Sequence, residues 1–218
     1  NEKVTHISAT PTFYRLFLPV KTQISSVQRI TVGGEKLDQL TAKRLKTVFV
    51  NARILNIYAS TEAGTVLASE NEVFTVPTEK KELVRVVDKE LFINSKLLGE
   101  SDSFKLVDGW YPTNDLVEII SENPLRFRFI ARKNEIINVG GYKVNPQEVE
   151  DVLISLGTIK EAFVYPKKNS VLGNIVCADI VISENSVTVP GLLKDLRSCL
   201  QEYKIPRIIN FVETINYS

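Results

Sequence analysis

Apolar positions in the first part of the chain fall into short runs that turn residues separate. β-Branched residues dominate 28–33 and 53–57, which predicts two strands, and apolar residues at helical spacing over 37–45 predict a helix after the first strand. Thr10 and Pro11 are typical of a helix start. The helix that starts at Pro11 is expected to have an apolar stripe of Phe13, Leu16 and Phe17.

Short strands with turn residues between them follow from residue 75 to residue 131. Period-two patches alternate there with fully apolar ones, and Asp-Gly and Asn-Pro steps separate them. The predicted strands cover 83–87, 91–93, 116–120 and 127–130. The pattern therefore predicts an α/β fold that continues into a β-rich, barrel-like segment.

The last third of the chain has a strand–helix pattern of its own, which predicts a small α+β domain. Asn145 and Pro146 are typical of an N-cap and a first helical position. Apolar residues at i, i+3, i+4 and i+7 over 149–156 predict a helix that Gly157 ends. A second helix is expected to begin near Pro190. The predicted strands of this part are 161–165, 175–182 and 208–212.

A glycine pair, Gly140 and Gly141, marks the change between the two patterns. It predicts a strand that turns sharply, or backbone that another group approaches closely. Residues 133–135 are polar and lack β-branching, so they can absorb a large change in backbone angles, and we expect a hinge at Asn134. A plain bend without chemistry is the alternative. The expected domains are 1–133 and 134–218.

Composition excludes several classes of protein. The 218 residues are 44% apolar and 24% charged, which is typical of an ordinary globular chain. The net charge is +1, and no basic run exceeds a lysine pair, so no nucleic-acid partner is expected. No apolar stretch approaches the length of a membrane span, and no signal peptide opens the chain.

Rare residue types narrow the chemistry further. His6 is the only histidine, which argues against a histidine metal site or a Ser-His-Asp triad. Cys177 and Cys199 lie in apolar contexts and are expected to be buried thiols in a reducing, cytoplasmic compartment. The chain contains no methionine, from which we expect either that it is incomplete or that modified methionines have been left out of the sequence.

Four polar boxes, in the order Gly33–Glu35, Tyr58–Gly64, Gly109–Leu116 and Arg132–Glu150, carry candidate chemistry. Alone, each could be an ordinary turn after a strand. Together they resemble the boxes of the adenylate-forming enzymes, which include acyl-CoA synthetases, peptide-synthetase adenylation domains and luciferases. The family pattern Gly-Arg-x-Asp-x-x-Ile-Lys-x-x-Gly-x-Arg-Ile-x-Pro-x-Glu-Ile-Glu lies over 131–150 without a gap.

The resemblance implies a role for each matching residue. Gly34, Glu35 and Tyr58 would frame adenine, Thr61 would touch the α-phosphate, Glu62 would hold Mg²⁺, Asp115 and Arg132 would hold the ribose, and Gly140 and Gly141 would line the thiol tunnel. An aromatic ring, a hydroxyl and a carboxylate are suited to adenine, phosphate and Mg²⁺.

The chain departs from the family pattern at five positions, Ala59, Pro112, Asn114, Ala131 and Asn134. The change from glycine to Asn114 is mild, because asparagine tolerates a left-handed backbone. Two family elements are missing: a phosphate loop before residue 1 and a lysine after Ser218. We therefore expect the C-terminal part of a larger enzyme, which would not adenylate well by itself.

The resemblance implies an ATP- and Mg²⁺-dependent ligase that activates a small-molecule carboxylic acid and transfers the acyl group to CoA. Asn145-Pro146-Gln147-Glu148 favours a CoA ligase. One alternative is an enzyme that loads the phosphopantetheine arm of an acyl carrier protein. The other, motivated by the five departures, is a catalytically silent homologue that binds a nucleotide or a partner domain.

Overall fold

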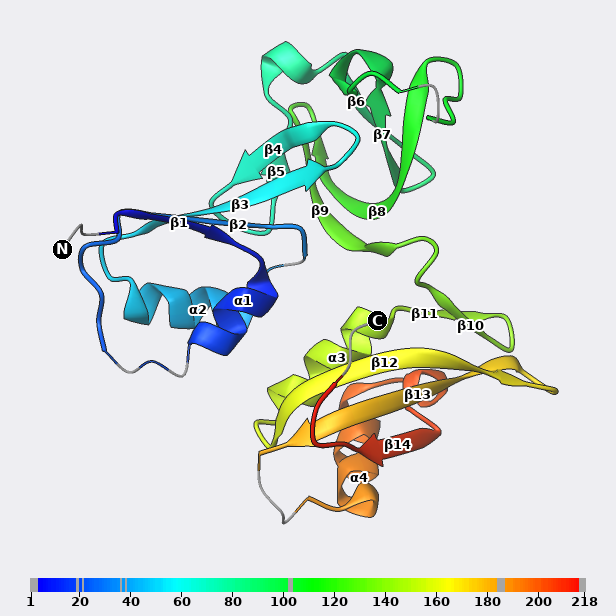
Figure 1. Ribbon diagram of the computed structural model, residues 1–218. Helices are drawn as coiled ribbons and strands as arrows, with labels where there is room; N and C mark the ends of the chain where they lie inside the picture. The colour runs from blue at the N-terminus through cyan, green and yellow to red at the C-terminus, as the bar shows by residue number, and fades with distance from the viewer. Residues whose placement is uncertain are drawn as a thin grey trace. The chain divides into compact units, whose positions relative to one another are not determined.

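The computed structural model describes residues 4–18, 20, 22–35, 37, 39–101, 104–183 and 187–215. The chain folds into two compact units, Asn1–Ile130 and Ala131–Ser218 (Figure 1). The division lies close to the boundary expected from the sequence. The assignment of two domains that meet at residues 133 and 134 stays a prediction.

The first unit begins with a four-stranded sheet in the order β1-β2-β3-β4, with β1, β2 and β3 parallel and β4 antiparallel to β3. Its elements are β1 His6–Ala9, α1 Pro11–Phe17, β2 Arg29–Gly33, α2 Gln39–Val48, β3 Arg53–Ser60 and β4 Gly64–Ser69. Figure 1 shows both helices on one face of this sheet. Ile30 and Val32 of β2 pack there with Leu45 and Phe49 in one hydrophobic core.

Helix α1 starts as predicted but buries a different side chain. The Thr10 hydroxyl accepts the Phe13 amide at 3.3 Å, and Pro11 is the first helical residue. Phe13 and Leu16 are 50% and 70% exposed, so these two residues of the predicted apolar stripe lie outside the core, whereas Phe17 packs against the core and Tyr14 is fully buried. The Tyr14 hydroxyl lies 3.2 Å from two backbone carbonyl oxygens, which lets a polar group remain in the core.

The second part of the first unit is a five-stranded sheet in the order β5-β9-β8-β7-β6. Its elements are β5 Phe74–Thr75, η1 Thr78–Lys80, β6 Val84–Val87, β7 Glu90–Asn94, η2 Ser95–Leu97, β8 Trp110–Glu122 and β9 Leu125–Arg132. Over the described residues the sheet is open, so the barrel-like expectation was wrong in this respect. β8 is much longer than the strand predicted over 116–120, because its first half contains the Trp110–Asp115 box.

The second unit is the small α+β fold that the sequence predicts. Its elements are β10 Ile137–Val139, β11 Tyr142–Val144, α3 Pro146–Ser155, β12 Ile159–Asn169, β13 Gly173–Ile182, α4 Val189–Cys199, η3 Glu202–Lys204 and β14 Ile208–Phe211. β13 pairs antiparallel with β12 and parallel with β14, and β10 and β11 form a hairpin. Asn145 caps α3 through the Gln147 amide at 3.1 Å, and Pro146 follows it, which confirms the predicted helix start.

The two cysteines differ in environment. Cys177 on β13 is fully buried, as predicted, and burial raises the pKa of its thiol. Cys199 is exposed, so its predicted burial was wrong. It is the last residue of α4, whose buried residues are Leu192 and Leu196, and the core position beyond it is filled by Leu200. No helix among the described residues is long and apolar enough to cross a membrane.

Replacing Leu196 by alanine should destabilise the second unit more than any surface change on the same helix. Leu196 is fully buried in the core between the helices and the sheet of this unit. A buried leucine-to-alanine change typically costs about 2–5 kcal/mol of unfolding free energy. Lys194→Ala, at an exposed position of α4, is the matched control. Equal denaturation midpoints for the two variants in urea would contradict the assigned core.

Candidate nucleotide-binding site

The hairpin between β3 and β4 presents the Thr61–Ala63 turn of the Tyr58–Gly64 box. β3 carries the box through Ser60, whose hydroxyl accepts the Ala63 amide at 3.2 Å and so closes the turn. The pairing of β3 with β4 shifts register between Tyr58 and Ala59. A strand irregularity of this kind changes the direction of the following side chains. The turn therefore places Glu62 beside the strands instead of within the sheet.

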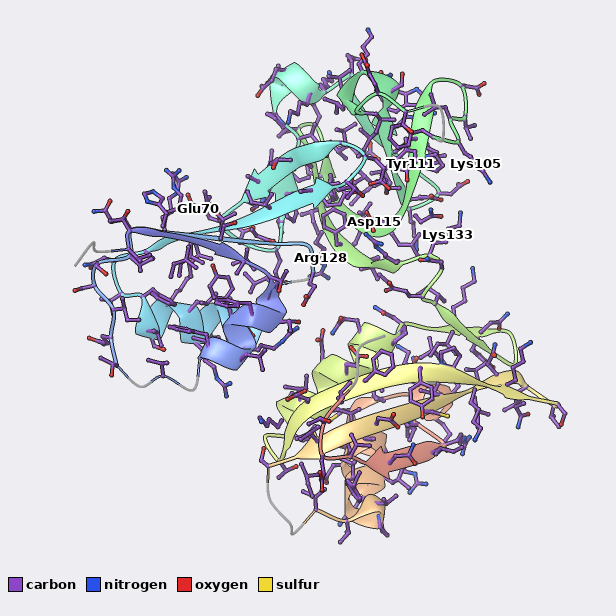
Figure 2. All side chains as sticks on the ribbon, in the orientation of Figure 1. Glu70, Lys105, Tyr111, Asp115, Arg128 and Lys133 are labelled. Carbon is purple, nitrogen blue, oxygen red and sulfur yellow. The ribbon has the colours of Figure 1, made fainter. Side chains whose placement is uncertain are left out.

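Two hydrogen bonds join this box to the Gly109–Leu116 box on β8, and in each bond a tyrosine of one box donates to a carboxylate of the other. The Tyr58 hydroxyl donates to Asp115 Oδ2 at 2.7 Å, and the Tyr111 hydroxyl donates to Glu62 Oε1 at 3.1 Å. Tyr111 and Asp115 both come from β8 (Figure 2). Each box thus contributes one phenol and one carboxylate. The structure brings together Tyr58, Glu62 and Asp115, three of the residues singled out from the sequence.

The role of Tyr111 was missed by sequence analysis. Neighbouring aromatic residues such as Trp110 and Tyr111 ordinarily pack into a core, but both are only half-buried here. The Arg85 guanidinium carbon lies 4.1 Å from the centre of the Trp110 ring. The Tyr111 hydroxyl donates to Glu62. The sequence signal that could have indicated this is the alternation of a strand, which turns neighbouring aromatic side chains to opposite faces.

Glu62 is suited to binding a cation. A hydrogen bond from its own backbone amide lowers the pKa of its carboxyl most, and bonds from Ser60, Tyr111 and Thr61 act in the same direction against the effect of burial. The carboxylate is therefore ionised at neutral pH. A single hard oxygen ligand of this type fits Mg²⁺, which usually takes one or two carboxylates from the protein and its other ligands from phosphates and water.

Tyr58 and Thr61, which the resemblance assigns to adenine and phosphate, already have contacts within the protein. The ring of Tyr58 packs against Phe129 with ring centres 4.6 Å apart, and its hydroxyl is bonded to Asp115. The Thr61 hydroxyl donates to Glu62 Oε2 at 3.2 Å. Both side chains are thus oriented by the protein itself, which reduces the entropy that a bound ligand would have to overcome.

Gly34 and Glu35 lie after β2, beside α1. Gly34 has a φ of +84°, a left-handed conformation that favours glycine. Glu35 Oε2 accepts the Thr12 hydroxyl at 2.6 Å and is paired with the Arg15 guanidinium at 3.0 Å. Thr12 and Arg15 were not singled out from the sequence. The structure thus places the Glu35 carboxylate against α1 and does not aim it at the Tyr58–Asp115 pair.

The remaining candidates belong to the second unit. Arg132 ends β9, and the Glu135 amide donates to the Arg132 carbonyl at 3.1 Å, so the exposed Asn134 lies in a turn. Gly140 and Gly141 form the tip of the β10–β11 hairpin with φ of +57° and +92°. Two consecutive positive φ values are typical of the tight turns that join hairpin strands. The sharp turn predicted at the glycine pair is confirmed.

Two departures from the family pattern have a structural account. Asn114 has a φ of +60°, so the asparagine at this position adopts a left-handed backbone, which asparagine tolerates better than most residues. Pro112 lies in β8 opposite Phe92 of β7, at an irregular stretch of the pairing. Proline is tolerated at such irregularities, because its missing amide removes no regular ladder bond there.

Comparison with known proteins agrees with the geometry. The model of the AMP-binding enzyme family matches residues 1–90, and that of the AMP-binding enzyme C-terminal domain matches residues 148–216. The chain belongs to the adenylate-forming enzyme superfamily. The two matches follow one another along the chain, and each lies within one of the two units.

The relatives of this superfamily member include a CoA ligase and a pyochelin synthase. A long-chain-fatty-acid–CoA ligase of Haemophilus influenzae is 26% identical over 210 residues, which cover 85% of this chain and 37% of that protein. A pyochelin synthase of Pseudomonas aeruginosa is 25% identical over 242 residues, which cover 97% of this chain and 44% of that protein. The chain therefore spans less than half the length of these relatives.

The fold of the adenylate-forming superfamily is also found by structural comparison. The crystal structure of ATP-bound MatB from Rhodopseudomonas palustris matches 99% of this chain and 48% of its own length, with a TM-score of 0.82 and 18% identity. At this identity the match establishes the fold alone. It agrees with the α/β class predicted from the sequence.

Proposed function

We propose that the full-length protein activates a carboxylic acid with ATP and passes the acyl group to the thiol of CoA. In the first step a carboxylate oxygen attacks the α-phosphorus, and pyrophosphate leaves. In the second step the thiol sulfur attacks the acyl carbon, its proton is lost, and AMP leaves with the carboxylate oxygen. The observation that carries this proposal is the reciprocal bonding of Tyr58 to Asp115 and of Tyr111 to Glu62.

The proposed roles follow from the chemistry of the joined boxes. Asp115 has one carboxylate oxygen bonded to Tyr58, and its carboxylate would accept the ribose hydroxyls. Glu62 would hold Mg²⁺, which supplies positive charge against the phosphate oxygens. The Tyr58 ring would lie beside adenine, and Thr61 would donate to phosphate when it leaves Glu62. Gly34, Glu35, Arg132, Gly140 and Gly141 keep the roles that the resemblance implies, as part of the same proposal.

A carrier protein is the alternative acceptor, which the resemblance to peptide-synthetase adenylation domains implies. The two acceptors can be separated by product analysis. The full-length protein is mixed with ATP, Mg²⁺, a panel of carboxylic acids and either CoA or a phosphopantetheine-bearing carrier protein. We expect AMP and an acyl-CoA thioester. If the CoA mixture gives acyl-adenylate but no thioester, while the carrier mixture gives acylated carrier protein, a carrier protein is the acceptor. If no acid gives AMP in either mixture, the protein is a catalytically silent homologue.

Replacing Glu62 by glutamine in the full-length protein should slow adenylate formation and raise the Mg²⁺ concentration needed. Glutamine keeps the size of the side chain and can still accept from Tyr111, but it lacks the charge that a hard cation prefers. Excess Mg²⁺ should restore part of the rate. Pyrophosphate exchange is measured against Mg²⁺ concentration, with Glu79→Gln as an exposed control in η1. A Glu62→Gln protein as fast as wild type at limiting Mg²⁺ would contradict the metal role.

A further inference from the structure

Glu90 is a buried carboxylate that the proposed mechanism does not use. It begins β7 and is 5% exposed. Among the described residues, the other polar side chains buried to this degree are Thr41 and Asp115. Burying a carboxylate costs free energy unless the group is hydrogen-bonded, whereas a leucine of similar size would suit a strand interior better. A buried glutamate at this position therefore needs a reason in the structure around it.

That reason lies in an irregularity of the β7–β8 pairing. Glu90 pairs with Leu116, but Phe92, two residues along β7, pairs with Pro112. Three residues of β8, Thr113 to Asp115, thus lie opposite the single residue Leu91. Such a bulge leaves backbone groups of the longer strand without ladder partners and turns its side chains in new directions. Asp115, the proposed ribose ligand, is the last residue of this bulge.

Glu90 and Leu91 of β7, together with Thr113 of the bulge itself, supply these partners. Glu90 Oε1 accepts the backbone amide of Asn114 at 3.1 Å. The Thr113 hydroxyl donates to the Leu91 carbonyl at 2.8 Å and accepts the Asp115 amide at 3.1 Å. The Glu90 carboxylate thus holds Asn114 in the middle of the bulge, and the Thr113 hydroxyl holds its two ends. Together these bonds fix the backbone of Asn114 and Asp115.

The bond from Glu90 matters most because Asn114 is left-handed. Asparagine tolerates a φ of +60° better than most residues with a side chain, but the extended backbone of a regular strand is open to it as well. A charge-assisted hydrogen bond in a buried setting opposes a change to that extended backbone. If Asn114 relaxed, the next residue would rotate, and the Asp115 carboxylate would leave the Tyr58 hydroxyl that now lies 2.7 Å away.

We propose that Glu90 is a positioning residue, whose carboxylate holds the Thr113–Asp115 bulge so that Asp115 is presented to the ribose hydroxyls of a bound nucleotide. The inference rests on the proposed nucleotide function. It assigns Glu90 no contact with substrate. Glu90 acts through the Asn114 backbone. A protein that lacks the Glu90 carboxylate should therefore lose its preference for nucleotides with ribose hydroxyls but keep the rest of its nucleotide affinity.

The test compares ATP with 2′,3′-dideoxy-ATP, which lacks the hydroxyls that Asp115 would hold. Affinities are measured by calorimetry on the full-length protein. Wild type should bind ATP about tenfold more tightly, as expected for a lost charge-assisted hydrogen bond. In Glu90→Leu, ATP should bind about as weakly as the dideoxy nucleotide, whose own affinity should be unchanged. Glu90→Gln, which keeps an acceptor oxygen, should retain most of the discrimination.

Two further variants separate positioning from stability. Ile93→Ala removes a buried side chain from the same strand, so it should lower the unfolding midpoint and leave the ATP preference intact. Asn114→Val strains the bulge from the other side, because a β-branched residue avoids the left-handed region, and should lose the preference as Glu90→Leu does. It provides the answer if Glu90→Leu does not fold.

The outcomes are distinct. Equal weakening of ATP and dideoxy-ATP in Glu90→Leu, or unchanged preference in both Glu90→Leu and Asn114→Val, would overturn the inference while leaving the ribose role of Asp115 standing. A Glu90→Gln protein as defective as Glu90→Leu would contradict the acceptor role. A wild-type protein without any preference for ATP would overturn the ribose role of Asp115, and the inference with it.

Discussion

Replacing Asp115 by alanine in the full-length protein should weaken ATP binding at least about tenfold, since a hydrogen bond to a charged group contributes about 1.5–3 kcal/mol. Asp115 is only 8% exposed, so its carboxylate lies in a largely dry setting where such a bond is strengthened. The change also removes the carboxylate oxygen that accepts the Tyr58 hydroxyl at 2.7 Å. Calorimetric titration with ATP measures the loss.

A matched control is available on the same strand. Glu118 on β8 is exposed and paired with Arg128, so Glu118→Ala removes a carboxylate of β8 that lies outside the bulge. It should leave ATP affinity unchanged, as surface ion pairs contribute little. Circular dichroism establishes that both variants fold. Unchanged ATP affinity in a folded Asp115→Ala protein would refute the assignment of this residue.

Replacing Asn134 by proline in the full-length protein should preserve one half-reaction and abolish most of the other. Asn134 is exposed in the turn after β9, where the Glu135 amide donates to the Arg132 carbonyl. Adenylation and thioester formation need different groups at the same carbon, which a rotating unit could supply in turn. Proline fixes φ near −65° and should hold one orientation. Pyrophosphate exchange is measured beside transfer from preformed acyl-adenylate to CoA.

Asn134→Ala is the control, because alanine removes the side chain but keeps the backbone freedom. It should retain both half-reactions. Equal loss of both in Asn134→Pro, with the fold intact, would argue against a hinge at this residue, and full retention of both would exclude it.

Local sequence signals predicted those elements whose ends are determined by neighbouring residues. Thr10 with Pro11 and Asn145 with Pro146 each start a helix as expected, because a cap bond and a fixed φ act over a few residues. The left-handed Asn114 and the turn at Gly140 and Gly141 follow from the same kind of local preference. The amphipathic pattern of the second unit was sufficient to predict its helices.

Features that depend on distant partners could not be predicted. The Tyr111 hydroxyl meets a carboxylate 49 positions away, and Glu90 meets a backbone amide 24 positions away, so neither contact leaves a local pattern. The barrel-like expectation was wrong because strand composition does not determine closure, which depends on how the edge strands pair. Cys199 was expected in the core because its neighbours are apolar, but the helix ends there and Leu200 takes the buried position.

The most direct test of the proposed chemistry follows one oxygen atom. A substrate acid labelled with ¹⁸O in its carboxylate is converted by the full-length protein with ATP, Mg²⁺ and CoA, and the products are analysed by mass spectrometry. Attack of the carboxylate on the α-phosphorus predicts one ¹⁸O in each AMP and none in pyrophosphate. Label in inorganic phosphate with release of ADP, or AMP without label, would contradict an acyl-adenylate intermediate.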